Sequence, residues 1–392
     1  MTAAAWNAEQ VFSDEDLRTE ILSRLPVKSV VRCRCVCKAW RALISHPLFV
    51  EKYTGRRTKS KSSFRLLLPI FPLRSVDYEA QGVAFREHYY PVSLPKPKRS
   101  LELYGSSHGI VCLAIDYHTI ILWNPSTGES NLLPEPPART GHDGSIDFYG
   151  FGYDSTTQDY KIVRGYDFEV YPECNFEVFS LKTGSWRRHP LVDVPFDLYS
   201  FEDIFGSIGQ GFVANDALHW MDSSLDVVAI LVFSFAEEKL QRMLPNLPPR
   251  GDAAYKFEVG TVGDCLSVYA ENPGIRSSSL WVMKEYGVQE SWTELLNFDP
   301  SGCLGTPNYP PMSGFTLRFL CFLENGELLL ANTEGDCDHF TLYDPKEKTF
   351  RDLIESNAGL SAPTRDAESL ERPVLGPIIY EETFVSPVIG SM

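Results

Sequence analysis

The sequence predicts a small all-α module near the N-terminus followed by a large all-β domain, a β-propeller of about six blades. Between Phe12 and Val50, apolar residues recur at helical spacing. From Phe64 onward, short runs of Val, Ile, Phe, Tyr and Leu alternate with clusters of Gly, Pro, Asn and Asp, a pattern typical of short strands. These runs repeat with a period of about fifty residues, as expected for four-stranded propeller blades.

The first helix of the module has both a start signal and a stop signal. Ser13 is a suitable N-cap, and Asp16 three residues later completes a capping-box pattern. Four apolar residues then fall on one helical face: Leu17, Ile21, Leu22 and Leu25. Pro26 is expected to stop this helix, because it lacks a backbone N–H and restricts the residue before it.

Two further helices are expected, one from Ser29 to Cys33 and one from Val36 to Ser45. The last carries an apolar stripe made of four residues: Val36, Trp40, Leu43 and Ile44. Pro47 is expected to close the module, which would then span residues 10–53. A helical unit of about forty residues is marginal as an independent fold, so we expect it to pack against something else.

Three stretches of the module match a known pattern in order and spacing: Leu25–Lys28, Arg32–Trp40 and Leu43–Phe49. They resemble an F-box, the module through which adaptor proteins dock on the Skp-type linker of a cullin-based (SCF) ubiquitin ligase. F-boxes commonly open with a Leu-Pro pair where this chain has Val11–Asp14. The resemblance and the apolar faces imply a linker-binding set: Leu17, Ile21, Leu25, Pro26, Lys28, Val31, Cys35, Val36, Trp40, Leu43 and Ile44. The alternative is an ordinary three-helix cap on a larger domain.

Five segments of the large domain share one pattern, an apolar strand, a turn and a second strand that carries a large side chain. Their first residues are Trp123, Phe179, Phe233, Val282 and Tyr343. Pro and Gly in turns such as Asn124–Gly128 fix the backbone angles that a tight connection requires. Strands between Phe64 and Val92 are expected to begin a further blade, and an apolar strand within Val374–Val388 could pair with it and close the ring. A β-sandwich is the alternative architecture.

The large domain, residues 64–390, carries a second resemblance. The matching segments are Tyr104–Leu113, Leu122–Gly128, Gly150–Ser155, Asp159–Val163 and Ala217–Trp220. They are similar to the F-box-associated domain of plant F-box proteins, a domain often grouped with kelch propellers. The paired glycines of a kelch blade are missing here, so the resemblance implies a kelch-like propeller. The S-locus F-box proteins of pollen belong to this broad family, and no motif separates that subgroup from the rest.

Charge is distributed unevenly along the chain. The formal net charge is −16, and the first 62 residues carry twelve Lys and Arg against six Asp and Glu, a net of +6. The remainder therefore carries −16 − 6 = −22. An acidic large domain repels nucleic acid, so the basic module is better matched to an acidic protein partner, and the large domain to a basic protein target. A solvated basic face remains the alternative for residues 52–61.

Two acidic regions of the large domain are candidates for a target-binding rim. Asp143 and Asp147 lie in the first region, and the second interleaves aromatic and acidic residues: Phe196, Tyr199, Phe201 and Asp203. Aromatic rings beside carboxylates suit protein recognition, because the rings anchor and the charges steer. A solvated acidic surface is the alternative.

We find no constellation of residues that predicts catalysis, a cofactor or a metal. Cys33, Cys35 and Cys37 lack the second Cys or His pair of a structural zinc site, so they are expected to be buried thiols. His219 is expected in the core or in a cross-strand pair. The glycine-rich segment 206–211 lacks the lysine of a phosphate-binding loop and is expected to connect two blades.

The sequence therefore predicts a non-catalytic substrate-recognition adaptor of an SCF-type ubiquitin ligase, with a Skp-type linker, a cullin and a protein target as partners. Neither an export signal nor a membrane-spanning run is apparent, so we expect the cytoplasm, the nucleus or both. A binding scaffold outside the ligase is one alternative, which co-purification with the linker would exclude. A propeller enzyme with a helical cap is another, and it would require reactive side chains at the central mouth.

Overall fold

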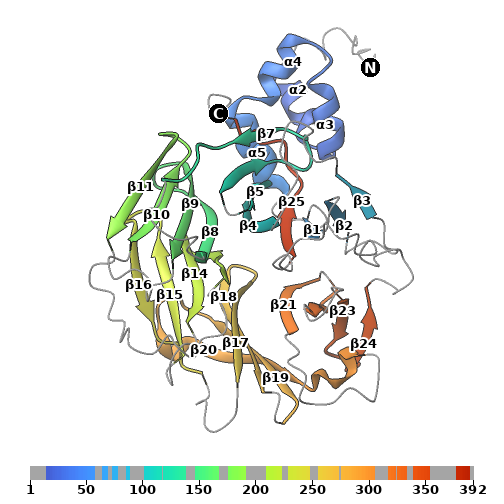
Figure 1. Cartoon of the computed structure of the whole chain (residues 1–392). Helices are drawn as coiled ribbons and strands as arrows, with labels where there is room; N and C mark the ends of the chain where they lie inside the picture. The colour runs from blue at the N-terminus through green and yellow to red at the C-terminus, as the bar shows by residue number, and fades with distance from the viewer. Residues whose placement is uncertain are drawn as a thin grey trace, which may run out of the picture.

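The protein is described from a computed structural model of the whole chain (Figure 1). The structure describes residues 15–57, 64–68, 73–77, 85–88, 101–116, 118–137, 146–166, 175–190, 209–222, 228–247, 255–272, 275–304, 317–323, 325–332, 339–353 and 377–388. The helices of the module stand beside one edge of a ring of sheets (Figure 1). The predicted division into an all-α module and an all-β propeller is therefore confirmed.

Four helices make up the described part of the module: α2 (Glu15–Leu22), α3 (Val27–Cys33), α4 (Lys38–Ile44) and α5 (Pro47–Arg57). Pro26 does not end α2, which stops at Leu22, but serves as the N-cap of α3 with φ −57° and ψ 150°. The third predicted helix starts at Lys38 rather than Val36, because Cys37 is its N-cap and its Sγ accepts a hydrogen bond from the backbone N–H of Trp40 at 3.4 Å. Ser13, the predicted cap of the first helix, lies outside the described residues.

The prediction that Pro47 closes the module is wrong. Pro47 is instead the first residue of α5, a position where the missing N–H costs nothing and the fixed φ favours a helix. Arg56 and Arg57, beyond the predicted end of the module at residue 53, belong to the same helix. Residues 58–63, between this helix and the first described strand, lie outside the described residues.

The described strands form six sheets, one for each blade of the propeller. The first blade contains β25 (Ile378–Glu381), β1 (Phe64–Leu68), β2 (Arg74–Val76) and β3 (Phe85–Glu87). The second contains β4 (Leu101–Ser107), β5 (Ile110–Ile115), β6 (Thr119–Trp123) and β7 (Ser130–Leu132). The third contains β8 (Ile146–Asp154), β9 (Asp159–Tyr166), β10 (Asn175–Ser180) and β11 (Ser185–Pro190).

The remaining blades follow the same antiparallel order. The fourth contains β13 (Phe212–Ala214), β14 (Ala217–Asp222), β15 (Ala229–Ser234) and β16 (Lys239–Met243). The fifth contains β17 (Lys256–Val262), β18 (Cys265–Asn272), β19 (Ser277–Met283) and β20 (Trp292–Phe298). The sixth contains β21 (Leu317–Phe322), β22 (Leu328–Asn332), β23 (His339–Asp344) and β24 (Thr349–Asp352). Two 3₁₀ helices, η3 (Gln289–Ser291) and η4 (Pro300–Leu304), lie before and after β20.

The repeat read from the sequence corresponds to the third and fourth strands of the blades. Trp123, Phe179, Phe233, Val282 and Tyr343 each lie at or near the end of a third strand, and the fourth strand follows after a turn. In the first of these turns the Asn124 side-chain oxygen accepts from the backbone N–H groups of Ser126 and Thr127. Gly128 completes the turn with φ +76°, a value that glycine adopts without strain.

The predicted ring closure is confirmed. β25, from the predicted C-terminal tail, pairs antiparallel with β1, with Phe64 opposite Glu381 and Leu67 opposite Ile378. One correction concerns the glycine-rich segment, where Gly209–Gln210 form a short strand, β12, parallel to β8. Residues 206–208 of that segment lie outside the described part.

The core of the propeller consists of hydrophobic layers between neighbouring blades. Each of the six pairs of neighbours shares one cluster of buried apolar side chains. The cluster between the third and fourth blades, for example, joins Phe148 and Val178 to Trp220 and Phe233. Because each blade contributes to two layers, burial accumulates around the ring, and the free energy of folding depends on every blade being present.

His219 is buried as predicted and links two blades. Its side chain is 0% exposed, and its Nε2 shares a 2.7 Å hydrogen bond with the Tyr286 hydroxyl from the β19–β20 turn. Burial lowers the pKa of His219 from 6.5 to about 4. The neutral imidazole is therefore the form that the folded propeller accommodates.

The stability of the propeller should consequently fall as the pH drops from 6.5 towards 4. In this interval the unfolded chain binds a proton at His219 that the folded chain does not bind. The free energy of unfolding therefore falls by at most about 1.4 kcal/mol for each pH unit. Above pH 6.5 the contribution is fully present. Urea unfolding at pH 7.5 and pH 5 should show a smaller loss of stability for His219→Gln than for the unchanged chain. Equal losses of stability in the two proteins would show that His219 is not the source of the pH dependence.

Candidate protein-docking site

The helical module has a compact core of its own. Its buried apolar side chains are Leu22, Val27, Val30, Ile44, Phe49 and Tyr53. The Tyr53 hydroxyl donates a 2.9 Å hydrogen bond to the carbonyl of Leu25, which ties α5 to the turn after α2. These contacts fix which faces of the short helices point inward.

The residues proposed for linker binding divide by their exposure. Ile44 is fully buried in the module, so it supports the fold and cannot face a partner as predicted. Five others are partly buried against this core or beside it: Leu17, Leu25, Val31, Trp40 and Leu43. Lys28 lies in α3, but its side chain is outside what the structure describes. The predicted stripe of the third helix is thus split between core and surface.

The exposed members are the strongest candidates for contact with a partner. Val36 is 64% exposed and Ile21 45%, while Pro26 and Cys35 are also exposed. Leu48, which sequence reasoning missed, is 68% exposed on the first turn of α5. If Pro47 had been recognised as the start of a helix, Leu48 could have been identified as an exposed residue, because neighbouring positions of a helix point in different directions and not all of them can face the core. Large apolar side chains at such exposure commonly mark a binding surface when they gather on one module.

The thiols of the module are more exposed than predicted. Cys35 and Cys37 are both exposed, and only Cys33 is partly buried. Cys35 lies in the turn between α3 and α4 and Cys37 is the N-cap of α4, so neither thiol is part of a helix that packs into the module core. Within the described part of the chain, no group of three or more His, Cys, Asp or Glu side chains could hold a metal ion.

A carboxylate holds the first and last helices of the module together. Glu20 of α2 forms ion pairs with Lys52 and Arg56 of α5 at 3.1 and 2.8 Å, and with Arg24 at 2.6 Å. Hydrogen bonds from Arg56 first, and then from Arg24 and Lys52, lower the pKa of Glu20 from 4.5 to about 2. This network faces solvent, so its role is to orient α5 rather than to supply much stability.

The C-terminal segment connects the module to the propeller. After β25, Phe384 packs against the stacked rings of Phe49 and Tyr53, with ring centroids 5.8 and 4.7 Å away. The Asn124 side-chain amide donates to the carbonyls of Thr383 and Val385 at 3.1 and 2.8 Å, which holds the segment on the second blade. The module and the propeller therefore share one chain segment as a common part of their cores.

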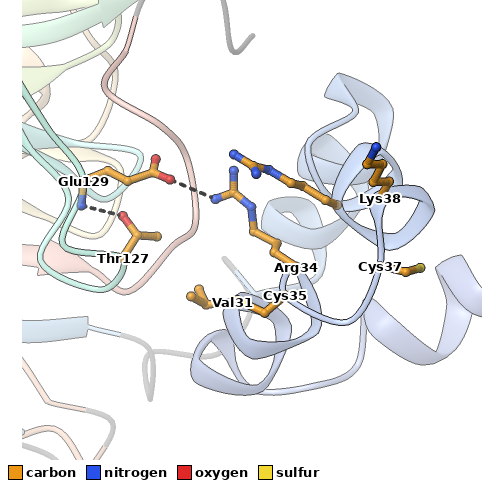
Figure 2. A pocket seen from close by; sticks show the side chains of 8 residues that line it. Val31, Arg34, Cys35, Cys37, Lys38, Thr127 and Glu129 are labelled. Carbon is orange, nitrogen blue, oxygen red and sulfur yellow. Dashed lines mark hydrogen bonds and ion pairs between the residues drawn. The ribbon is translucent and has the colours of Figure 1, made fainter.

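A basic cleft lies where the module meets the second blade (Figure 2). Its volume is about 500 Å³, and it is lined by Val31, Arg34, Cys35, Cys37, Lys38, Arg41, Thr127 and Glu129. Arg34 points across the gap to Glu129, with 3.4 Å between the guanidinium and the carboxylate (Figure 2). The cleft thus has one wall from α3 and α4 and the other from the turn before β7.

The two ends of the propeller differ in the length of their connections. At one end of the propeller lie the turns that join the first strand of a blade to the second and the third strand to the fourth. From the second blade on, the longest of these turns runs from Met283 to Trp292. At the other end, the connections from each blade to the next are long, the shortest running between Met243 and Lys256. The module contacts a turn of the first end, Asn124–Glu129, so the end with long connections points away from it.

The structure describes only one residue of the predicted target-binding rim. Asp147 lies in β8, beside a register irregularity between Ile146 and Phe148. The other rim residues lie outside the described residues: Asp143, Phe196, Tyr199, Phe201 and Asp203.

Family comparison agrees with this two-part architecture. Residues 14–52 match the F-box domain, and residues 83–322 match the F-box associated beta propeller domain. The second match covers more than half of the chain. The chain belongs to the plant F-box proteins with an F-box-associated propeller.

Individual F-box proteins from Arabidopsis thaliana are similar along most of the chain. F-box protein CPR1 is 32% identical over 301 residues, which cover 71% of this chain and 71% of that protein. F-box/kelch-repeat protein At3g23880 is 28% identical over 292 residues, covering 72% and 78%. A solved structure of TolB from Acinetobacter baumannii covers 73% of this F-box protein and 62% of that chain with a TM-score of 0.37 and 12% identity. None of the described helices of this F-box protein is long and apolar enough to cross a membrane.

Phe384→Ala should loosen the F-box without unfolding the propeller. The substitution removes a side chain that is 4% exposed and packed against Phe49 and Tyr53, and a buried Phe→Ala change costs about 3 kcal/mol or more. Amide hydrogen exchange should therefore accelerate in α5 while the strands of the fourth and fifth blades keep their protection. Val388→Ala, in the same segment but 43% exposed, is the control. Unchanged exchange in α5 would show that the module does not depend on this contact.

Proposed function

We propose that this F-box protein is the substrate-recognition adaptor of an SCF-type ubiquitin ligase. The observation that supports the proposal is that one chain combines an F-box with a propeller and holds the F-box against a turn of that propeller. The F-box exposes Val36 and Leu48 for docking, and the end of the propeller with long connections points away from it. Long connections on a rigid scaffold are where binding residues concentrate.

The proposed partners are a Skp-type linker, a cullin held through that linker, and a protein target. The linker would contact the exposed apolar residues of the F-box together with the partly buried ones beside them. The chain would perform no bond chemistry itself. It would instead hold a lysine of the target near a charged ubiquitin-conjugating enzyme, which raises the effective concentration of that lysine.

The charge of the propeller supports a basic target. Residues after Ser62 carry a net charge of −22, which favours association with a basic surface and disfavours an acidic one. The proposed target rim is the long-connection end, with Asp143, Asp147, Phe196, Tyr199, Phe201 and Asp203. The proposed domains are residues 10–53 and 64–390, and the proposed location is the cytoplasm, the nucleus or both.

Docking on the linker should depend on the exposed apolar residues of the F-box. Val36→Asp and Leu48→Asp each place a charge in the proposed interface, and each should weaken linker binding about tenfold or more. Both side chains are largely exposed, so the F-box should remain folded. Binding is measured by titrating purified linker onto the full-length chain.

Ile275→Asp is the matched control, because Ile275 is 70% exposed on the fifth blade, far along the chain from the F-box. This variant should bind the linker like the unchanged chain. If Val36→Asp and Leu48→Asp also bind normally, the proposed docking surface is wrong. If the unchanged chain does not bind the linker at all, the adaptor function itself is wrong.

The double variant Val36→Asp, Leu48→Asp should protect the target in cells. Because the propeller is unaltered, the variant should still bind the target, compete with the intact protein and raise target abundance. Proximity labelling with the double variant would identify the target. The half-life of the target would then be measured in cells that contain only the intact protein and in cells that contain only the double variant. A target degraded at the normal rate with the double variant alone would contradict the adaptor mechanism.

A further inference from the structure

We propose that the basic cleft between the F-box and the second blade binds an acidic segment of the linker protein, so that this partner contacts the propeller as well as the F-box. The inference rests on the proposed function, since it names a further contact of the same partner. The cleft has walls from both parts of the chain, with Arg34 and Lys38 on one side and Thr127 and Glu129 on the other (Figure 2).

The cleft has a fixed shape because Arg34 is held at both ends of its guanidinium. One nitrogen donates to Glu129 Oε1 at 3.4 Å, and the other donates to Ser45 Oγ at 3.3 Å at the end of α4. The Arg34 side chain is only 15% exposed. This two-sided anchor joins the turn after α3, the end of α4 and the start of β7. The propeller wall therefore stays in place beside the helices.

The lining carries an excess of positive charge. Arg34, Lys38 and Arg41 contribute three cations against the single carboxylate of Glu129, a net charge of 3 − 1 = +2. Lys38 and Arg41 are exposed, and neither forms an ion pair with any residue that the structure describes. Two cations that are unused within the chain remain available to the carboxylates of a partner.

The surroundings of the cleft favour a protein segment over a small anion. Cys35 and Cys37 line the cleft, and Val36, an exposed apolar residue of the proposed linker-binding surface, lies between them in the chain and is 64% exposed. We infer that a protein docked on Val36 also reaches Lys38 and Arg41, which follow Val36 within five residues of the chain. Apolar contacts at the centre with charged groups at the margin form the usual arrangement of a protein interface.

The propeller wall provides a test that leaves every F-box residue unchanged. Thr127→Glu adds a negative charge at the cleft, and it should weaken binding of the purified linker to the full-length chain about three- to fivefold at low salt. The weakening should shrink at high salt, because ions screen exposed charges. Thr183→Glu is the matched control, since Thr183 lies in the corresponding Thr-Gly turn of the third blade and does not line the cleft. It should bind like the unchanged chain.

Lys38→Glu gives a second measurement from the opposite wall. It should weaken linker binding with the same dependence on salt as Thr127→Glu. If Thr127→Glu and Thr183→Glu bind the linker equally well, the linker does not reach the propeller and the inference is wrong, although the adaptor function stands. Stabilisation of the chain by inorganic pyrophosphate, with linker binding unaffected by Thr127→Glu, would show a small-anion site and would also overturn it. Failure of the unchanged chain to bind the linker would instead refute the proposed function.

Discussion

The pairing of β25 with β1 joins the last strand of the propeller to its first and so closes the ring, and the rest of the structure depends on it. Without β25, the first blade would present the unpaired edge of β1 at its inner side. The hydrophobic layers on both sides of that blade would also lose apolar contacts, because Ile378 and Tyr380 pack towards the second blade and Ile379 towards the sixth. A ring of six mutually supporting layers is therefore completed by one short strand.

The same segment determines how the F-box is held. Immediately after β25, the Thr383 hydroxyl donates to the carbonyl of His108 at 2.8 Å, at the β4–β5 turn. Gly109 is required in that turn, because its φ is +77° and a Cβ there would collide with Thr383. Phe384 then enters the core of the F-box. Ring closure and F-box orientation are thus consequences of one continuous stretch of backbone, which explains how a marginal helical unit becomes firmly seated on its propeller.

Charge is used differently inside the propeller and at its junction with the F-box. Lys161, 4% exposed, lies between the Asp154 and Glu238 carboxylates at 2.9 Å and so links the third blade to the fourth. Removing one partner of such a buried group would leave an uncompensated charge, so this contact favours a single arrangement of the blades. At the cleft, by contrast, Lys38 and Arg41 remain exposed to solvent. Buried charges here specify the fold, whereas exposed ones are available for recognition.

The sequence alone determined the fold class, the repeat and the F-box, because helical periodicity, turn residues such as Asn124 and Gly128 and apolar strands are local signals. It also indicated that a strand within Val374–Val388 could close the ring. Only the tertiary structure decided which apolar residues face outward, since Ile44 and Val36 belong to one predicted stripe yet one is buried and the other exposed. It likewise revealed that Pro47 begins a helix and that Phe384 lies in the F-box core. Those outcomes depend on contacts between segments far apart in the chain, which no local pattern records.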